Sequence, residues 1–300
     1  MITLLCNLLL LILCSAEFQE KEERECNAQC KLIEDEAEMG YVIKGIQFQD
    51  ITNLDTQSVN QLKSTLLKNG VVVIERQNMT KQQLIDFSAK LGQVVVLPPS
   101  LQGNDPDADF PAIKRVTNYW SNGTWKENNY CFGCHWHKDG DFQQNGYMAS
   151  VLYADELTEN RSATLFLDNC EVVQKLTDKT RKDLSESVFE VSFRHITDYA
   201  KGKKEDPQAK RHMGIYHHPE NGRKCAYMTA NLVTEKGVAH HLAGAWVEVT
   251  EKSKKYTHFW KKGDVVIWDN LAVMHKAGTT GFVGPGDRTP RMLYRTQVLI

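Results

Sequence analysis

Residues 135–142 read His135-Trp136-His137-Lys138-Asp139-Gly140-Asp141-Phe142. Within this stretch, His137 and Asp139 stand two residues apart, and such residues point to the same side of an extended strand. An imidazole and a carboxylate on one side of a strand can bind one metal ion. His275, which follows the apolar run 265–268, is the candidate third ligand. Two histidines and one carboxylate on one face of an ion leave its other positions open, as in non-haem Fe(II) sites.

The His-x-Asp triplet is weakly specific by itself, because a hydrogen-bonded pair of His137 and Asp139 at a strand end is the ordinary alternative. The end of the chain adds a second signal. Arg291 and Arg295 share one face of a predicted strand with Leu293. Buried guanidinium groups are costly unless anions meet them. We therefore expect anionic ligands at this face, and the alternative is two arginines on a solvated strand.

Four stretches follow one another in a characteristic order. They are Trp136-His137 with Asp139, His218-Pro219 followed by Gly222-Arg223-Lys224, Trp268-Asp269-Asn270 with His275, and Arg291-Met292-Leu293-Tyr294-Arg295. From about Gly70 to its end, the chain resembles the taurine dioxygenase (TauD/TfdA) family of Fe(II)- and 2-oxoglutarate-dependent oxygenases. Several motifs in the order of the family are more specific than any one of them alone.

The resemblance implies a fold and a metal centre. The expected fold is mainly β with flanking helices (α+β), built on a double-stranded β-helix, a jelly roll of the cupin type. His137, Asp139 and His275 would bind Fe(II) and form the catalytic centre. Asp269 and Asn270 are expected to orient the loop that carries His275.

The resemblance also implies how the cosubstrate is bound. Arg291 would pair with the distal carboxylate of 2-oxoglutarate, and the hydroxyl of Thr164 would assist. A planar guanidinium suits a carboxylate better than a lysine does. Arg288 is a lesser candidate for the Arg291 role, because the 16-residue step from His275 to Arg291 is longer than is usual in the family. For Thr164 the alternative is a plain β-branched strand residue.

Arg295 matches the family position that binds an anionic headgroup of the substrate. Taurine itself is not expected, because Leu97 and Ser100 replace a histidine and a tyrosine of the taurine enzymes. The predicted reaction is hydroxylation of a small, anionic organic molecule by O2, with release of succinate and CO2 from 2-oxoglutarate. The alternatives are an inactive secreted jelly-roll binding protein, a zinc hydrolase with the same three ligands, and an enzyme that hydroxylates a protein side chain.

The composition excludes some partners. The 300 residues include 36 Lys and Arg against 38 Asp and Glu, with a formal net charge of −2, and no basic stripe suggests binding to nucleic acid. No segment is long and apolar enough to predict a membrane span. Cys131-x-x-Cys134-His135 matches c-type haem attachment, a zinc half-site or a redox pair, and a disulfide is the favoured interpretation. The oligomeric state is not predicted.

The N-terminal region predicts a secretory-pathway protein, either secreted or held in the endoplasmic reticulum. Residues 1–16 read as a signal peptide, 17–40 as an acidic arm with a short helix around Cys26 and Cys30, and 41–300 as the dioxygenase domain. Six cysteines remain after the signal peptide, which is compatible with disulfides. Sequons at Asn78, Asn122 and Asn160 predict a glycoprotein.

Apolar periodicity predicts the elements around the barrel. Residues 57–69 and 80–91 have helical spacing, and Val71 to Ile74 between them reads as a strand that is buried on both faces. Thr80 and Gln83 predict a capping box at the start of the second helix. Residues 172–184 read as one charged surface helix.

Overall fold

The computed structural model describes residues 30–32, 39–45, 51, 53–96, 107–126, 133, 135–141, 146–158, 162–191, 210–229, 239–278 and 289–299. The predicted signal peptide and most of the predicted arm lie outside these ranges. So do Leu97, Ser100, Cys131, Cys134, Asn160 and Arg288.

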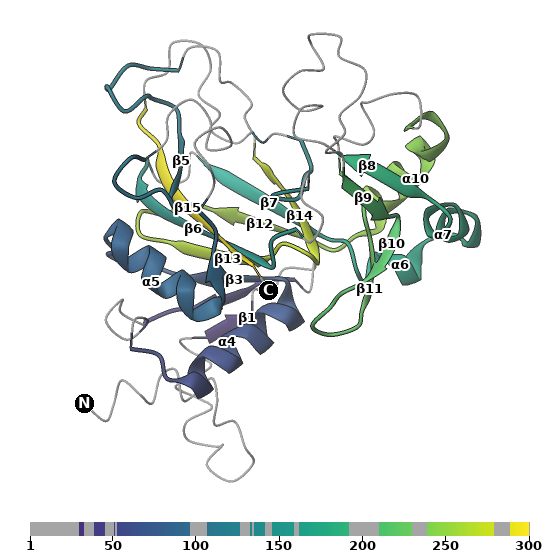
Figure 1. The fold of residues 1–300 in the computed structure, drawn as a ribbon, viewed down its shortest axis with the longest axis horizontal. Helices are drawn as coiled ribbons and strands as arrows, with labels where there is room; N and C mark the ends of the chain where they lie inside the picture. Colours follow the sequence, from purple (N-terminus) through teal and green to yellow (C-terminus); the bar gives the residue numbers. More distant parts are fainter. Residues whose placement is uncertain are drawn as a thin grey trace.

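Two β-sheets form the body of the protein (Figure 1). The major sheet has eight strands, in the order β1 (Cys30–Leu32), β2 (Tyr41–Ile43), β3 (Val71–Ile74), β13 (Val265–Asp269), β6 (Ala149–Glu156), β15 (Met292–Leu299) and β4 (Gln93–Val94), with β5 (Lys114–Thr117) also paired to β15. The minor sheet has the order β12 (Lys255–Phe259), β7 (Ala163–Asp168) and β14 (Val273–Ala277). Strands β2 and β3 are parallel, whereas the other pairs of these two sheets are antiparallel.

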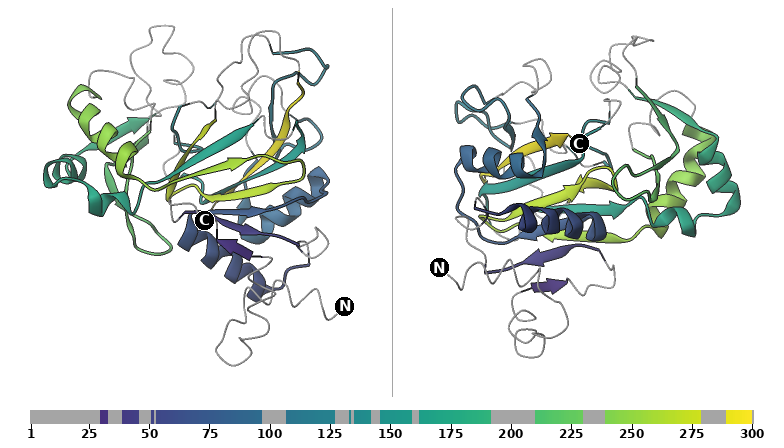
Figure 2. Two further views of the ribbon diagram at one scale, coloured as in Figure 1. Left: turned by 180° about the vertical axis from the view of Figure 1, so that it is seen from behind. Right: turned by 60° about the horizontal axis from the view of Figure 1, so that its bottom comes forward.

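Helices α4 (Thr56–Asn69) and α5 (Lys81–Leu91) cover the outer face of the major sheet (Figure 1, Figure 2). The capping box predicted at Thr80 is present, because Thr80 and Gln83 each bond the backbone of the other. Gly70 ends α4 with a φ of 73°, a conformation that glycine adopts without strain. These helices bury the side chains on the outer face of the major sheet. The inner face of that sheet is turned toward the minor sheet.

The inner faces of the two sheets enclose a separate apolar layer. Its members include Phe166 from β7, Trp268 from β13 and Leu293 from β15. Because side chains alternate along a strand, residues two apart from these also face inward. The inner face of the major sheet therefore carries Arg295 as well as Leu293.

A lobe of helices and two β-hairpins lies beside the two sheets. It comprises α6 (Val172–Lys175), α7 (Asp178–Ser185), α10 (Ala239–Lys252), and the hairpins of β8 (Val188–Val191) with β9 (Lys210–Met213) and β10 (Ile215–His217) with β11 (Lys224–Ala226) (Figure 1). These elements share their own apolar core.

Two local predictions were wrong. The single helix predicted over residues 172–184 is broken, because Leu176 has an extended backbone and Thr177 caps a new helix by accepting a hydrogen bond from Thr180 N. The helix predicted around Cys26 and Cys30 is contradicted at Cys30, which begins strand β1 and pairs with Ile43. Pairing with β2 prevails there over the helical spacing of the two cysteines.

Candidate metal centre

A backbone bridge brings the two predicted histidine ligands together. His137 N donates to His275 O over 3.0 Å, and His275 N donates to His137 O over 2.9 Å. Residues that face each other in an antiparallel bridge point to the same side. The two imidazole rings accordingly lie side by side, with centroids 4.2 Å apart. Residues 138 positions apart in sequence thus present their rings to one point.

Asp139 joins the two histidines, as its spacing from His137 predicts. One ligand atom from each of His137, Asp139 and His275 lies within 4.8 Å of the other two. The Nδ1 atom of His137 lies 2.7 Å from His135 O. Because a carbonyl only accepts, this contact places the proton on Nδ1 and leaves the lone pair of Nε2 for a metal.

Charge and burial keep these groups in the protonation states that a metal needs. Burial alone would raise the pKa of Asp139, but Arg295 and the two histidines lower it below its ordinary value. Arg295 Nη1 donates to Asp139 Oδ1 over 2.5 Å, and Ser150 Oγ donates to Oδ2 over 2.8 Å. Burial lowers the pKa of His275 well below its ordinary value, and His137 adds to this effect. A carboxylate and a neutral imidazole are the metal-binding forms.

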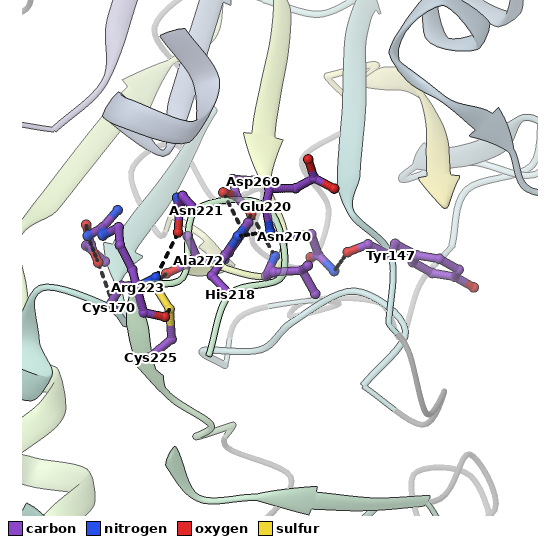
Figure 3. Close-up of polar contacts among 12 residues, drawn as sticks. Tyr147, Cys170, His218, Glu220, Asn221, Arg223, Cys225, Asp269, Asn270 and Ala272 are labelled. Carbon is purple, nitrogen blue, oxygen red and sulfur yellow. Dashed lines mark hydrogen bonds and ion pairs between the residues drawn. A yellow bond between two sulfur atoms is a disulfide. The ribbon is translucent and has the colours of Figure 1, made fainter. Parts of the chain in front are cut away.

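Asn270 holds the backbone of Asp139 from both sides. Asp139 N donates to Asn270 Oδ1 over 2.9 Å, and Asn270 Nδ2 donates to Asp139 O over 2.8 Å. The same Nδ2 donates to Tyr147 O over 3.2 Å (Figure 3). The amide therefore fixes the backbone of Asp139 and links it to Tyr147. Asn270 was expected to orient the loop that carries His275, whereas its side chain bonds the backbone of Asp139 and Tyr147.

Asp269 and His218 fix the turn that leads to His275. Asp269 Oδ1 accepts from Leu271 N over 3.1 Å and from Ala272 N over 3.0 Å. Behind it, His218 Nε2 lies 3.0 Å from Asp269 Oδ2 (Figure 3). Glu220 N donates to His218 Nδ1, so the ring proton is on Nε2 and is donated to Asp269. The buried His218 was singled out by its motif, but its partner was not predicted.

Residues of the lobe also bind the segment 138–141, next to the candidate metal ligands. Lys138 Nζ donates to Tyr216 Oη over 2.9 Å and to the carbonyl of Leu271. Burial lowers the pKa of Lys138 to about 7. Asp141 O accepts from Tyr227 Oη over 3.0 Å. These contacts attach the segment that carries His137 and Asp139 to the lobe.

The residues expected to bind the cosubstrate approach one another across the two sheets. Arg291, immediately before β15, donates from Nε to Ser162 Oγ over 2.8 Å. Burial lowers the pKa of Arg291 to about 10. Thr164 lies two residues after Ser162, and its Oγ1 accepts from Trp260 Nε1 over 2.9 Å. The hydroxyl hydrogen of Thr164 therefore remains available to donate.

A cysteine pair lies behind the turn of His275. Cys170, at the end of β7, and Cys225, in β11, are joined by a disulfide (Figure 3). Nearby, Asn169 N donates to Ala272 O, and Ala226 N donates to Asn169 O. This pair attaches the hairpin of β10 and β11 to the strand ends next to the metal centre.

A jelly-roll body with a His/Asp/His centre between its sheets defines a class of metal-dependent proteins. The family model described as "Taurine catabolism dioxygenase TauD, TfdA family" matches residues 31–297. The protein belongs to this family. No helix in the described part of the chain is long and apolar enough to cross a bilayer.

Curated relatives are distant but cover most of the chain. An alpha-ketoglutarate-dependent 2,4-dichlorophenoxyacetate dioxygenase of Burkholderia sp. (strain RASC) is 24% identical over 241 residues, which is 74% of this chain and 81% of the relative. Pentalenolactone F synthase of Streptomyces avermitilis is 24% identical over 300 residues, which is 87% of this chain and 91% of the relative. The similarity extends beyond the ligand motifs to the whole domain.

Solved structures confirm the predicted jelly-roll fold. A putative alpha-ketoglutarate-dependent taurine dioxygenase from Burkholderia xenovorans aligns with a TM-score of 0.68 at 23% identity, over 87% of this chain and 86% of that chain. AAD-2 in complex with Mn(II) and N-oxalylglycine aligns with a TM-score of 0.69 at 20% identity, over 87% of this chain and 93% of that chain.

Proposed function

We propose that this protein is an Fe(II)- and 2-oxoglutarate-dependent dioxygenase that hydroxylates a small, anionic organic molecule and releases succinate and CO2. The observation that carries the proposal is the convergence of His137, Asp139 and His275 on one point between the sheets. Family membership supports the same chemistry, and the relative from Burkholderia sp. (strain RASC) is an alpha-ketoglutarate-dependent dioxygenase.

The donor set fits Fe(II). Nitrogen and carboxylate oxygen donors on one face of an ion suit this metal, and the other positions stay open for ligands. The buried Nδ1 of His275 has no hydrogen-bond partner among the described residues, and the Nε2 atom of the same ring lies 3.8 Å from Asp139 Oδ1. When bound, Fe(II) and 2-oxoglutarate would together supply the activation of O2.

The fit to 2-oxoglutarate depends on Arg291. Its guanidinium is half-buried between the sheets, and Ser162 is the hydrogen-bond partner that the structure records for its side chain. Ser162 is neutral, so a half-buried cation there favours an anionic ligand. We infer that Arg291 binds the distal carboxylate of 2-oxoglutarate and that the Thr164 hydroxyl donates to the same ligand.

Arg295 would serve two partners in turn. In the structure it is paired with Asp139. A metal bound by Asp139 would compete for the same carboxylate charge and leave Arg295 with positive charge to offer. We infer that an acidic group of the substrate takes this place and thereby orients the rest of the molecule toward the metal.

The turnover of 2-oxoglutarate tests the proposal without knowledge of the substrate. Wild-type protein with Fe(II), O2 and 2-oxoglutarate should release succinate slowly even without a substrate, and Asp139→Ala should release none. A control variant, Glu186→Gln at the exposed residue that caps the C-terminal end of α7, should behave as the wild type. Equal succinate release by Asp139→Ala and the wild type would contradict the proposal.

We further propose that the protein enters the secretory pathway and is glycosylated. The signal-like residues 1–16 support this, as do the exposed side chains of Asn78 and Asn122 and the Cys170–Cys225 pair. N-terminal sequencing of the protein from eukaryotic cells should begin near Glu17, and glycosidase treatment should lower its mass. A protein that keeps Met1 and does not respond to the glycosidase would contradict this proposal.

A further inference from the structure

Lys114 lies directly opposite Arg295 on the inner face of the major sheet. Strand β5 pairs antiparallel with β15, and the register sets Lys114 against Arg295 and Val116 against Leu293. Residues in such positions point to the same side, with Cβ atoms about 4.5–5.5 Å apart. Leu293 belongs to the apolar layer between the sheets, and Val116 packs against that layer. Lys114 therefore points, like Arg295, into the space between the sheets.

The charges around Lys114 are those of the metal centre. Burial, and after it the charge of Arg295, lower the pKa of Lys114 to about 8, while Asp139 acts in the opposite direction. Arg295 is already paired with Asp139. Like charges that face each other across two strands destabilise the pairing. An anion that lay between the side chains of Lys114 and Arg295 would be attracted by both cations.

The next residue provides a contrast on the same strand. Arg115 faces Tyr294 in the register, and Tyr294 packs against the apolar layer on the outer side of the sheet. Because side chains alternate along a strand, Arg115 points away from the site that Lys114 faces. Adjacent basic residues thus lie in different surroundings, and only Lys114 shares the side of Arg295.

We propose that Lys114 and Arg295 together bind an oxyanion headgroup of the substrate, so that Lys114 is a specificity-determining residue. The inference rests on the proposed function, which places a substrate beside Asp139. A guanidinium offers a planar fork and an ammonium offers a compact charge with three donors. From two neighbouring strands, these groups can bond different oxygens of one carboxylate, sulfonate or phosphonate. Lys114 would thus select against neutral molecules.

Inorganic sulfate is a suitable probe for this site. The protein is first loaded with Mn(II) and N-oxalylglycine, so that the carboxylate of the analogue occupies Arg291 and sulfate reports a different site. Calorimetric titration should then give a sulfate Kd about 10- to 100-fold weaker in Lys114→Met than in the wild type, as expected for the loss of one charged hydrogen-bond partner. Lys114→Arg should retain most of the affinity, and Arg115→Met should match the wild type.

Other outcomes overturn the inference. Wild-type affinity in Lys114→Met, no sulfate binding by the wild type, or an equal loss in Arg115→Met would each do so. Lys114→Gln, which keeps a polar end on the side chain but no charge, serves if Lys114→Met does not fold. The Fe(II) and 2-oxoglutarate absorption band separates this inference from the proposed function. That band should persist in Lys114→Met. Its absence in the wild type would instead contradict the proposed function.

Discussion

Replacement of Asn270 by alanine removes the side chain that fixes Asp139. Four hydrogen bonds end on this amide, with Asp139 N and Trp268 Nε1 as donors to Oδ1 and with Asp139 O and Tyr147 O as acceptors from Nδ2. A buried polar group that loses its partner costs about 1–3 kcal/mol, and the low end applies where water enters the vacated space. We therefore expect Asn270→Ala to lower the free energy of unfolding by about 4 kcal/mol.

The same substitution should weaken metal binding, because Asp139 is no longer held opposite the histidines. Urea unfolding measures the stability, and calorimetric titration with Mn(II) measures the affinity. Asn221→Ala is the matched control, since Asn221 is exposed in a turn and accepts one hydrogen bond from Arg223 N. The control should stay within about 0.5 kcal/mol of the wild type, as most surface substitutions do. An Asn270→Ala protein with the stability and Mn(II) affinity of the wild type would refute the reasoning.

Three further perturbations test other parts of the site. Burial lowers the pKa of Lys138 from 10.5 to about 7. Between pH 7 and pH 10.5 the unfolded chain therefore binds a proton at Lys138 that the folded protein lacks. In this range the free energy of unfolding should rise with pH by up to about 1.4 kcal/mol per pH unit. Lys138→Met should abolish this rise in urea unfolding, and equal slopes would contradict it. Arg291→Met should weaken 2-oxoglutarate binding about 100- to 1,000-fold, as loss of a buried charge partner does, with a smaller loss in Arg291→Lys; calorimetric affinities that match the wild type would exclude the Arg291 clamp. Thr164→Val should lower the free energy of unfolding by about 1–3 kcal/mol, because Trp260 Nε1 loses its hydrogen-bond acceptor. An unfolding curve that is unchanged in Thr164→Val but altered in Thr164→Ser would contradict this.

The metal ligands were predictable because their geometry is mostly local. The two-residue step from His137 to Asp139 fixes a common face on any extended strand. His275 comes after residues 265–268, whose apolar run predicts a central strand of the sheet. The same alternation placed Arg295 on the inner face with Leu293. For Arg295, strand periodicity determines which way the side chain points, whereas Asp139 lies in a turn just after the bridge between His137 and His275.

The supporting contacts were not predictable, because they depend on which strands become neighbours. His218 meets Asp269, which is 51 residues away, and Lys138 meets Tyr216, which is 78 residues away. Neither partner has a spacing that a local pattern could reveal. Lys114 shares this property, since its role follows from the register of β5 against β15. A single sequence contains the alternation within each strand but not the pairing between strands.

The most direct test of the central claim is anaerobic absorption spectroscopy of the purified protein with Fe(II) and 2-oxoglutarate. The proposed chelate predicts a visible charge-transfer band that is absent in His137→Ala and weakened in Arg291→Ala. A folded, metal-loaded wild-type protein that shows no such band would contradict the dioxygenase assignment and would favour the binding-protein or zinc-hydrolase alternatives.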